Sequence, residues 1–264
     1  MTDLIDSINL RQMRSGAAVK IYSLPGGLSA AEQASLDVVA AQARGRRILD
    51  IGVGGGRTVE ALRAVSTDYL GIDNSPQMVE ACRARYPGAR FELADARRLD
   101  LPDASVGLVM FSCNGIGMVG HEDRLLILRE VHRVLEPGGV FLFSTHNQNC
   151  PDHDKGFQFP QFVVTRNPVL LGIRALRFVW HTGVSLVNRA RFSRHDLRTP
   201  EYSVINDYCH DYGVMLYYIT LANQRRQLEA AGFRPQAQAF DLDGRPIAEG
   251  ADSTLSSIAF IARK

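Results

Sequence analysis

The chain has 264 residues, 45% of them hydrophobic and 22% charged, and its formal net charge is +2. These values describe one globular domain that can build a core without a metal or disulfide staple, and the small net charge does not favour a nucleic-acid ligand. The four cysteines, Cys82, Cys113, Cys150 and Cys209, form no CxxC pair, so we expect free thiols in a reduced, cytoplasmic protein.

The first 45 residues are expected to form a helical segment, and they lack the apolar core of a signal peptide. Residues 46–147 then alternate short β-branched runs with helical segments, which predicts a parallel α/β core. Strands are expected at Arg47–Ile51, Asp68–Ile72, Arg90–Leu93, Val106–Phe111 and Val140–Ser144. Helices are expected at Thr58–Ala64, Pro76–Tyr86 and Glu122–Leu135.

This alternation stops after Asn147, and residues 148–220 are predicted to form an insertion. Within it, residues 151–200 hold seven Arg and one Lys but only three Asp and no Glu, so this stretch is basic. Its longest apolar run contains Arg174, Arg177 and His181, which would be costly inside a bilayer, so no transmembrane helix is predicted. The insertion ends in two expected strands, Glu201–Tyr208 and Gly213–Thr220.

The C-terminal part, residues 221–264, is predicted to complete the sheet. A helix is expected at Ala222–Ala231 because Gly232 follows it as a stop signal. Two further strands are expected at Phe233–Asp241 and Ser256–Ala262. The sheet is therefore expected to be interrupted by the insertion and finished by the end of the chain.

A glycine-rich loop, Asp50-Ile51-Gly52-Val53-Gly54-Gly55-Gly56, stands between the first strand and the first helix of the core. Glycines allow a tight turn and a close approach of a ligand to the backbone, and the helix that follows presents free N–H groups. A dinucleotide fingerprint would need a third glycine where this chain has Arg57. The alternative is a strand-to-helix turn that needs glycine for its own geometry alone.

Two acidic residues follow the next strands of the core. Asp73 ends the second strand, about 20 residues beyond the loop, where a carboxylate suits both hydroxyls of a ribose. Asp95 follows the third strand and is placed to accept from an adenine amino group. Either residue alone could be a helix cap, but three such features at one sheet edge indicate a nucleotide-like ligand.

In combination these segments resemble the class I S-adenosylmethionine-dependent methyltransferases. The matching text runs through RRILDIGVGGG, YLGIDNSPQMVEACRARYP, FELADARRLDLPDASVGLVMFS and REVHRVLEPGGVFLFSTHN, about half of the chain. The resemblance implies an α/β fold with a doubly wound, mostly parallel sheet of seven strands in the order 3-2-1-4-5-7-6. Strand 7 would be antiparallel, and the insertion after strand 5 would be a lid over the substrate.

The resemblance also implies S-adenosyl-L-methionine as the cofactor, with the N-terminal segment folded over its site. The residues implied to bind it are Tyr22, Asp50, Gly52, Gly54, Asp73, Asn74, Met78, Asp95, Ala96 and Ser112. For Tyr22 the alternative is an aromatic side chain that merely anchors the N-terminal segment.

The acceptor is less well defined by the sequence. The end of the fourth strand lacks the [DN]PP[YF] motif of adenine-modifying DNA methylases, which argues against DNA. His146 is the candidate base, with an idle loop histidine as the alternative. Candidate substrate contacts are Asn114, His121, Asn147, Arg174 and Arg177.

Two of these substrate candidates have open alternatives. His121 could simply begin a helix. The insertion's arginines could bind an anionic acceptor, snorkel along a solvated lid helix, or belong to a helix at a membrane surface.

The predicted function is methyl transfer from S-adenosyl-L-methionine to nitrogen or oxygen, less readily carbon, of a small biosynthetic acceptor, which would be anionic if the arginines contact it. No metal site is predicted, because the histidines lack ligand spacing. Two alternatives remain at this point. One is a protein that binds the cofactor without turnover, and the other is a transferase that moves another group from a related sulfonium cofactor.

Overall fold

The computed structural model describes residues 2–24 and 26–264, except for the side chains of residues 2, 3 and 154. Its strands are β1 (Ile48–Ile51), β2 (Tyr69–Asp73), β3 (Arg90–Leu93), β4 (Val106–Phe111), β5 (Leu135–Asn147), β6 (Leu197–Arg198), β7 (Tyr202–Asp207), β8 (Val214–Ile219), β9 (Gln238–Phe240), β10 (Pro246–Ile247) and β11 (Ser257–Arg263).

Nine α-helices are formed by the described residues. They are α1 (Thr2–Met13), α2 (Gly16–Tyr22), α3 (Ala30–Ala43), α4 (Val59–Val65), α5 (Pro76–Arg85), α6 (His121–Val134), α7 (Pro168–Phe192), α8 (Cys209–Tyr212) and α9 (Leu221–Ala230). Three short 3-10 helices are η1 (Gly115–Met118), η2 (Pro151–Asp154) and η3 (Ser193–His195).

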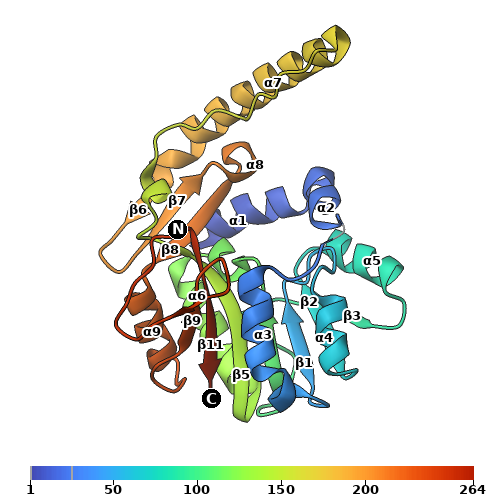
Figure 1. The fold of residues 1–264 in the computed structure, drawn as a ribbon, viewed down its shortest axis with the longest axis vertical. Coiled ribbons are helices and arrows are strands. Elements are labelled where there is room, and N and C mark those ends of the chain that lie inside the picture. The colour runs from blue at the N-terminus through green and yellow to red at the C-terminus, as the bar shows by residue number, and fades with distance from the viewer. Residues whose placement is uncertain (1, 25) are drawn as a thin grey trace.

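The strands form one sheet whose main path runs β10-β9-β11-β5-β4-β1-β2-β3 (Figure 1). Strands β1 to β5 pair in parallel, and β11 is antiparallel to both β5 and β9. The predicted order 3-2-1-4-5-7-6 is therefore confirmed as β3-β2-β1-β4-β5-β11-β9, with β11 as the antiparallel strand.

The predicted count of seven strands is too low, because the described residues form eleven. β5 runs on to Asn147, beyond the expected end at Ser144, and this extension pairs with β8 through His146 and Asn147. β7 and β6 then add to β8. The strand pair that was assigned to the lid is thus part of the sheet.

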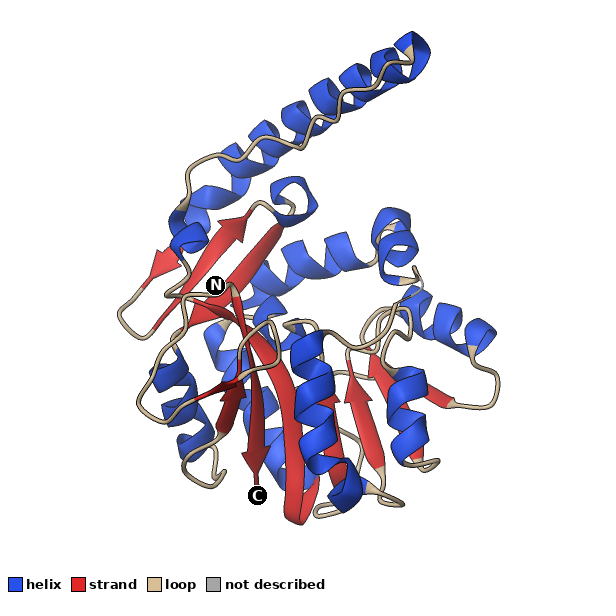
Figure 2. Ribbon diagram, in the orientation of Figure 1, coloured by secondary structure: helices blue, strands red, loops and turns tan. Residues whose placement is uncertain are grey.

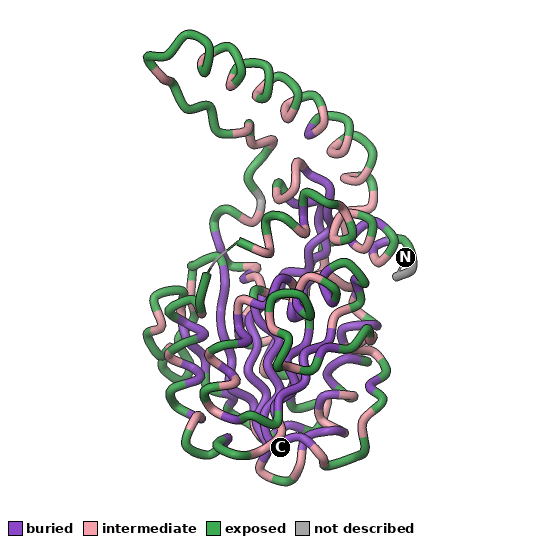
Figure 3. The backbone as a smooth tube through the Cα atoms, turned by 90° about the vertical axis from the view of Figure 1, so that its right-hand side faces the viewer, coloured by how far each residue is buried: buried purple, intermediate pink, exposed green. Residues whose placement is uncertain are grey.

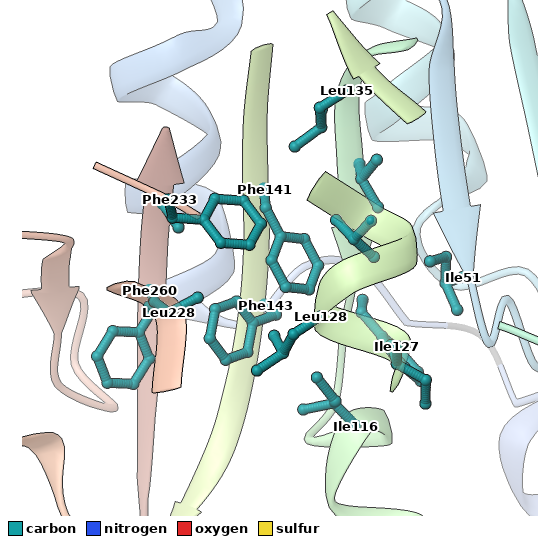
Figure 4. Packing of buried hydrophobic residues seen from close by; sticks show 14 of the residues in the cluster. Ile51, Ile116, Ile127, Leu128, Leu135, Phe141, Phe143, Leu228, Phe233 and Phe260 are labelled. Carbon is teal, nitrogen blue, oxygen red and sulfur yellow. The ribbon is translucent and has the colours of Figure 1, made fainter. Parts of the chain in front are cut away.

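Helices cover both faces of the sheet, with α3, α4 and α5 on one face and α6 and α9 on the other (Figure 2). Because side chains alternate along a strand, neighbours such as Ile48 and Leu49 enter different cores, one on each face. On the α6 face, the Phe141 and Phe143 rings stack at 4.5 Å, and Phe143 lies 5.3 Å from the ring of Phe260 (Figure 4). This packing holds the carboxyl ends of the central strands in fixed positions.

Helix α7 stands away from the sheet instead of closing over it, and the extended chain before it runs back along its length (Figures 1 and 3). Several large apolar side chains on it are exposed, including Leu176 at 75% and Trp180 at 70%. The inserted helices were expected to form a lid, and in this structure α7 does not close over the sheet. No helix in the described part of the chain is both long and apolar enough to span a membrane.

Candidate functional site

The glycine-rich loop follows β1 and is shaped by two close approaches. Gly52 has a φ of +62°, a left-handed conformation that favours glycine, and a Cβ there would lie 2.8 Å from the Phe111 ring. A Cβ on Gly55 would lie 2.3 Å from the carbonyl oxygen of Tyr22. The loop is therefore packed directly beneath the end of α2, and no other residue type fits at Gly55 without moving that helix.

A cavity of about 390 Å³, called the first cavity here, lies at the carboxyl edge of β1, β2 and β4. This volume falls in the range of about 300–1,000 Å³ that is typical of small-molecule sites. Its walls include nine of the ten residues expected to bind a cofactor, namely Tyr22, Gly52, Gly54, Asp73, Asn74, Met78, Asp95, Ala96 and Ser112.

Asp73 ties the wall of this cavity together. One carboxylate oxygen accepts from the Gly54 N–H at 2.9 Å, and the other accepts from the Ser75 N–H at 2.9 Å. Burial raises the pKa of Asp73, and these backbone N–H groups oppose the shift. The carboxylate thus holds the glycine loop in place and also faces the cavity.

Asp50 is the tenth expected residue, and the structure does not bring it to the first cavity. It is fully buried, and one of its oxygens accepts from the hydroxyls of Thr58 at 2.5 Å and Tyr69 at 2.8 Å. The prediction of a direct contact is therefore corrected, because Asp50 instead joins β1 to the residue that precedes α4. Burial raises its pKa to about 6, although the two hydroxyl donors act in the other direction.

Because the pKa of Asp50 is raised in the folded protein, we expect the free energy of unfolding to depend on pH. Between about pH 4 and pH 6 the carboxyl ionises in the unfolded chain before it does so in the folded protein, so rising pH favours unfolding by up to about 3 kcal/mol. Asp50→Asn removes this contribution, so the variant should gain stability relative to the parent as pH rises through this window. Urea unfolding at pH 4.5, 5.5 and 7 measures the difference. A constant difference across these pH values would show that Asp50 does not titrate in this way.

Asp95 lines the first cavity, but a neighbour already occupies its oxygens. Arg97 donates from Nε to both oxygens of Asp95 at 3.0 Å, and the Nη1 of Arg97 lies 2.9 Å from Asp123 and 3.1 Å from Asp6. Burial opposes ionisation of Asp95, yet hydrogen bonds from Arg97 leave its pKa lowered. Neither Arg97 nor Asp6 was among the predicted residues. For Arg97, the available sequence signal was its position two residues after Asp95, within reach of that carboxylate.

The N-terminal helices lie across the first cavity and contribute to its lining. The buried side chain of Asn9 donates to the Met215 carbonyl at 2.8 Å and accepts from the Met215 N–H at 2.9 Å, which fixes α1 against β8. The Tyr22 hydroxyl lies 3.1 Å from Nε2 of His210, in the turn between β7 and β8. Tyr22 therefore joins the end of α2 to the inserted strands.

A second cavity, of about 370 Å³, adjoins the first, since Arg57 and Cys113 line both. Glu32 holds these two residues in place, because its carboxylate accepts from Arg57 at 2.6 and 2.8 Å and from the Cys113 N–H at 3.0 Å. The ends of β4 and β5 and the turn after β7 supply much of the remaining wall. Its polar lining includes Asn114, Ser144, His146, His153, Asp207, Tyr208, Cys209, Tyr218 and Ser257.

His146 lies in the second cavity near the end of β5. Its Nδ1 is 3.5 Å from the side-chain nitrogen of Asn114, and its ring centroid is 5.0 Å from that of Tyr218. Burial lowers the pKa of His146 to about 4, helped by the charge of Arg124 and opposed by that of Asp207. The imidazole is therefore neutral at pH 7, with one ring nitrogen unprotonated.

Of the predicted substrate residues, Asn114 lines the second cavity, and the other four line neither cavity. His121 is the first residue of α6, which is the alternative position expected for it, and its Nδ1 lies 2.8 Å from the Tyr217 hydroxyl. Asn147 is fully buried, and its side chain donates to the carbonyls of Ser253 and Leu255. Arg174 donates to the Val163 carbonyl at 3.0 Å, and Arg177 is exposed on the same protruding helix.

Comparison with known proteins places this geometry in context. Residues 48–139 match the methyltransferase domain family. Over 105 residues the chain is 36% identical to a Mycolicibacterium smegmatis protein named as a probable S-adenosylmethionine-dependent methyltransferase, and the match covers 39% of each chain. The chain therefore matches about two fifths of that relative's length.

Solved structures are similar over nearly the whole chain. The CcbJ methyltransferase of Streptomyces caelestis has a TM-score of 0.61 at 16% identity, with 93% of this chain and 95% of that chain covered. CalS10 of Micromonospora echinaspora, described as an amino pentose methyltransferase, has a TM-score of 0.57 at 17% identity, with 90% and 92% covered. At such identities these likenesses show a shared fold.

Proposed function

We propose that the protein is a class I S-adenosylmethionine-dependent methyltransferase that transfers a methyl group to nitrogen or oxygen of a small-molecule acceptor. The match of residues 48–139 to the methyltransferase domain family supports the reaction class. The observation that carries the proposal is the pair of adjoining cavities, which share Arg57 and Cys113 at the end of β4. A donor in the first cavity and an acceptor in the second would meet at this boundary.

The lining of the first cavity fits S-adenosyl-L-methionine. Gly52 and Gly54 leave backbone exposed beside β1 for the methionine moiety, while Asp73 is positioned for the ribose hydroxyls. Met78 and Ala96 supply apolar and backbone surface for the adenine. Tyr22 and α1 would close this site from the N-terminal side and exclude water.

When bound, S-adenosyl-L-methionine supplies a sulfonium methyl carbon, to which the acceptor's lone pair bonds while the carbon–sulfur electron pair stays on sulfur. The protein's contribution is then mainly to align the two molecules and exclude water. A hydroxyl or N–H nucleophile must also lose a proton, and His146, whose neutral imidazole lines the second cavity, would accept it. An anionic acceptor is not part of the proposal, because Arg174 and Arg177 lie away from both cavities.

The first test is ligand binding by calorimetry. We expect S-adenosylmethionine and its demethylated product to bind and NAD not to bind, because Arg57 replaces the glycine that a dinucleotide loop requires. Incubation of the protein with cell extract and methyl-labelled S-adenosylmethionine should then label a low-molecular-mass product. Binding of NAD with no binding of either sulfonium-cycle ligand would overturn the cofactor. Cofactor binding with no methyl transfer to any extract fraction would instead favour a protein that binds without turnover.

A further inference from the structure

We propose that the acceptor carries a protonated amine and that Asp207 is the residue that binds it. This inference rests on the proposed function, since it assumes that the second cavity holds the acceptor. It concerns the recognition of the acceptor, which is separate from the proton transfer assigned to His146.

The charges around the second cavity support a cationic ligand. Three carboxylates line it, those of Glu32, Asp152 and Asp207. Glu32 is paired with Arg57, and Asp152 is paired with Lys155. Among the residues that the structure describes, no lysine or arginine forms an ion pair with Asp207, although the residue is only 6% exposed. A buried carboxylate without a cation is costly, and a cationic ligand would remove that cost.

The hydrogen bonds of Asp207 fix its direction and leave it able to accept more. One oxygen accepts from the Cys209 N–H at 2.8 Å, and the other accepts from the Tyr218 hydroxyl at 2.5 Å. The Cys209 thiol also hydrogen-bonds to Asp207. All of these donors are neutral, and a carboxylate has about four acceptor positions. Burial, with the charge of Asp207 as the next contribution, raises the pKa of the Cys209 thiol and of the Tyr218 phenol, so these groups stay protonated at neutral pH.

Aromatic rings surround this part of the cavity. The ring of Tyr218 lies 5.0 Å from that of His146 and 4.7 Å from that of His153, and all three residues line the wall. Faces of such rings attract ammonium groups, most strongly where water is excluded. An ammonium that pairs with Asp207 would therefore also have ring surface beside it.

The positively charged side chains near the second cavity do not favour an anionic acceptor over a cationic one. Arg57 is already held by Glu32, and Arg124 is fully buried, does not line the second cavity and donates to neutral acceptors such as the Ile116 carbonyl and Thr145. An anionic acceptor would face the Asp207 carboxylate without a free counter-charge. An ammonium bound by Asp207 has no lone pair, so this nitrogen could take the methyl group only after it loses its proton.

The experiment uses three probes of similar size and different charge. Calorimetry on the full chain saturated with S-adenosylhomocysteine would compare 2-phenylethylamine, 2-phenylethanol and 3-phenylpropanoate. We expect the amine to bind at least about tenfold more tightly than the alcohol and the carboxylate to bind more weakly than both. An amine that binds no more tightly than the alcohol would overturn the inference, whatever the variants show.

Two variants then test whether Asp207 causes the preference for the amine over the alcohol. Asp207→Asn should bring the amine and the alcohol within about twofold of each other, whereas Asp211→Asn, which removes a nearby carboxylate that lines neither cavity, should retain the preference for the amine. Retention of the preference in Asp207→Asn would overturn the assignment. S-adenosylhomocysteine binding by each variant checks its folding, and failure of the parent protein to bind this product would count against the proposed function and not against the inference alone.

Discussion

Replacing His146 by glutamine is expected to lower kcat for methyl transfer by about 100- to 10,000-fold, the usual contribution of a positioned general base. Glutamine keeps a polar side chain at this position but cannot accept a proton at neutral pH. Since His146 lines the second cavity and not the first, cofactor affinity should change little. Single-turnover rates and cofactor titrations on the same preparations separate the two quantities.

His121→Gln is the matched control for this variant, because His121 lies outside both cavities. Its kcat should stay close to that of the parent once the folded fraction is taken into account. The pH profile gives a second readout. Because burial lowers the pKa of His146 to about 4, the neutral base is fully present at pH 6 to 8 and is lost only as pH falls through about 4. Equal losses in the two variants, or none in His146→Gln, would contradict the assignment of the base.

Asp73→Ala is expected to weaken binding of S-adenosylmethionine by roughly ten- to a hundredfold, or about 1.5–3 kcal/mol. The loss has two sources. The ribose hydroxyls would lose their charged acceptor, and the Gly54 N–H would lose the carboxylate that positions the glycine loop. Calorimetry with the cofactor and with its demethylated product measures the effect.

Asp68→Ala is the matched control for Asp73→Ala, since Asp68 lies just before β2 at the other end of the same strand and pairs with Arg47 on the surface. This variant should bind the cofactor as the parent does, because exposed ion pairs are typically worth under about 1 kcal/mol. Should Asp73→Ala fold normally and bind as tightly as Asp68→Ala, the ribose would have to be held by another residue.

The doubly wound core could be predicted from sequence because its signals are local. Several core strands are short apolar runs, and a chemically distinctive residue ends or follows two of the strands, since Asp73 ends β2 and Asp95 follows β3. Since parallel strands end at one edge, this information was enough to bring the glycine loop, Asp73 and Asp95 together, whereas Arg97 and Asp6 of the same cavity were missed. Asp50 was the exception, because its burial depends on Tyr69, a residue on the neighbouring strand.

The second cavity could not be assembled in the same way, because it depends on long-range pairing. β8 joins the sheet by pairing with His146 and Asn147 at the end of β5. No local sequence pattern predicts this pairing. Asp207 comes beside His146 only after this pairing has formed. Asp207 lies near the end of an expected strand, but β7 is antiparallel to β8, so the shared carboxyl edge that identified Asp73 gave no signal for it. The basic charge of the insertion instead predicted Arg174 and Arg177 as substrate contacts.

The protruding helix α7 has a consequence for local unfolding. It extends over 25 residues, about 37 Å, yet Ser185 is its single buried residue. Most helices in proteins are stabilised by the packing of one face, which α7 largely lacks. The Asn167 side chain caps its first turn, and its C-terminal half is tied to the turn after β7, where His181 and Asn188 bond to Asp211. Its amide hydrogens should therefore exchange with solvent long before those of β4 and β5. The outer part of the insertion can open and close as a separate cooperative unit while the strands that carry the site remain folded.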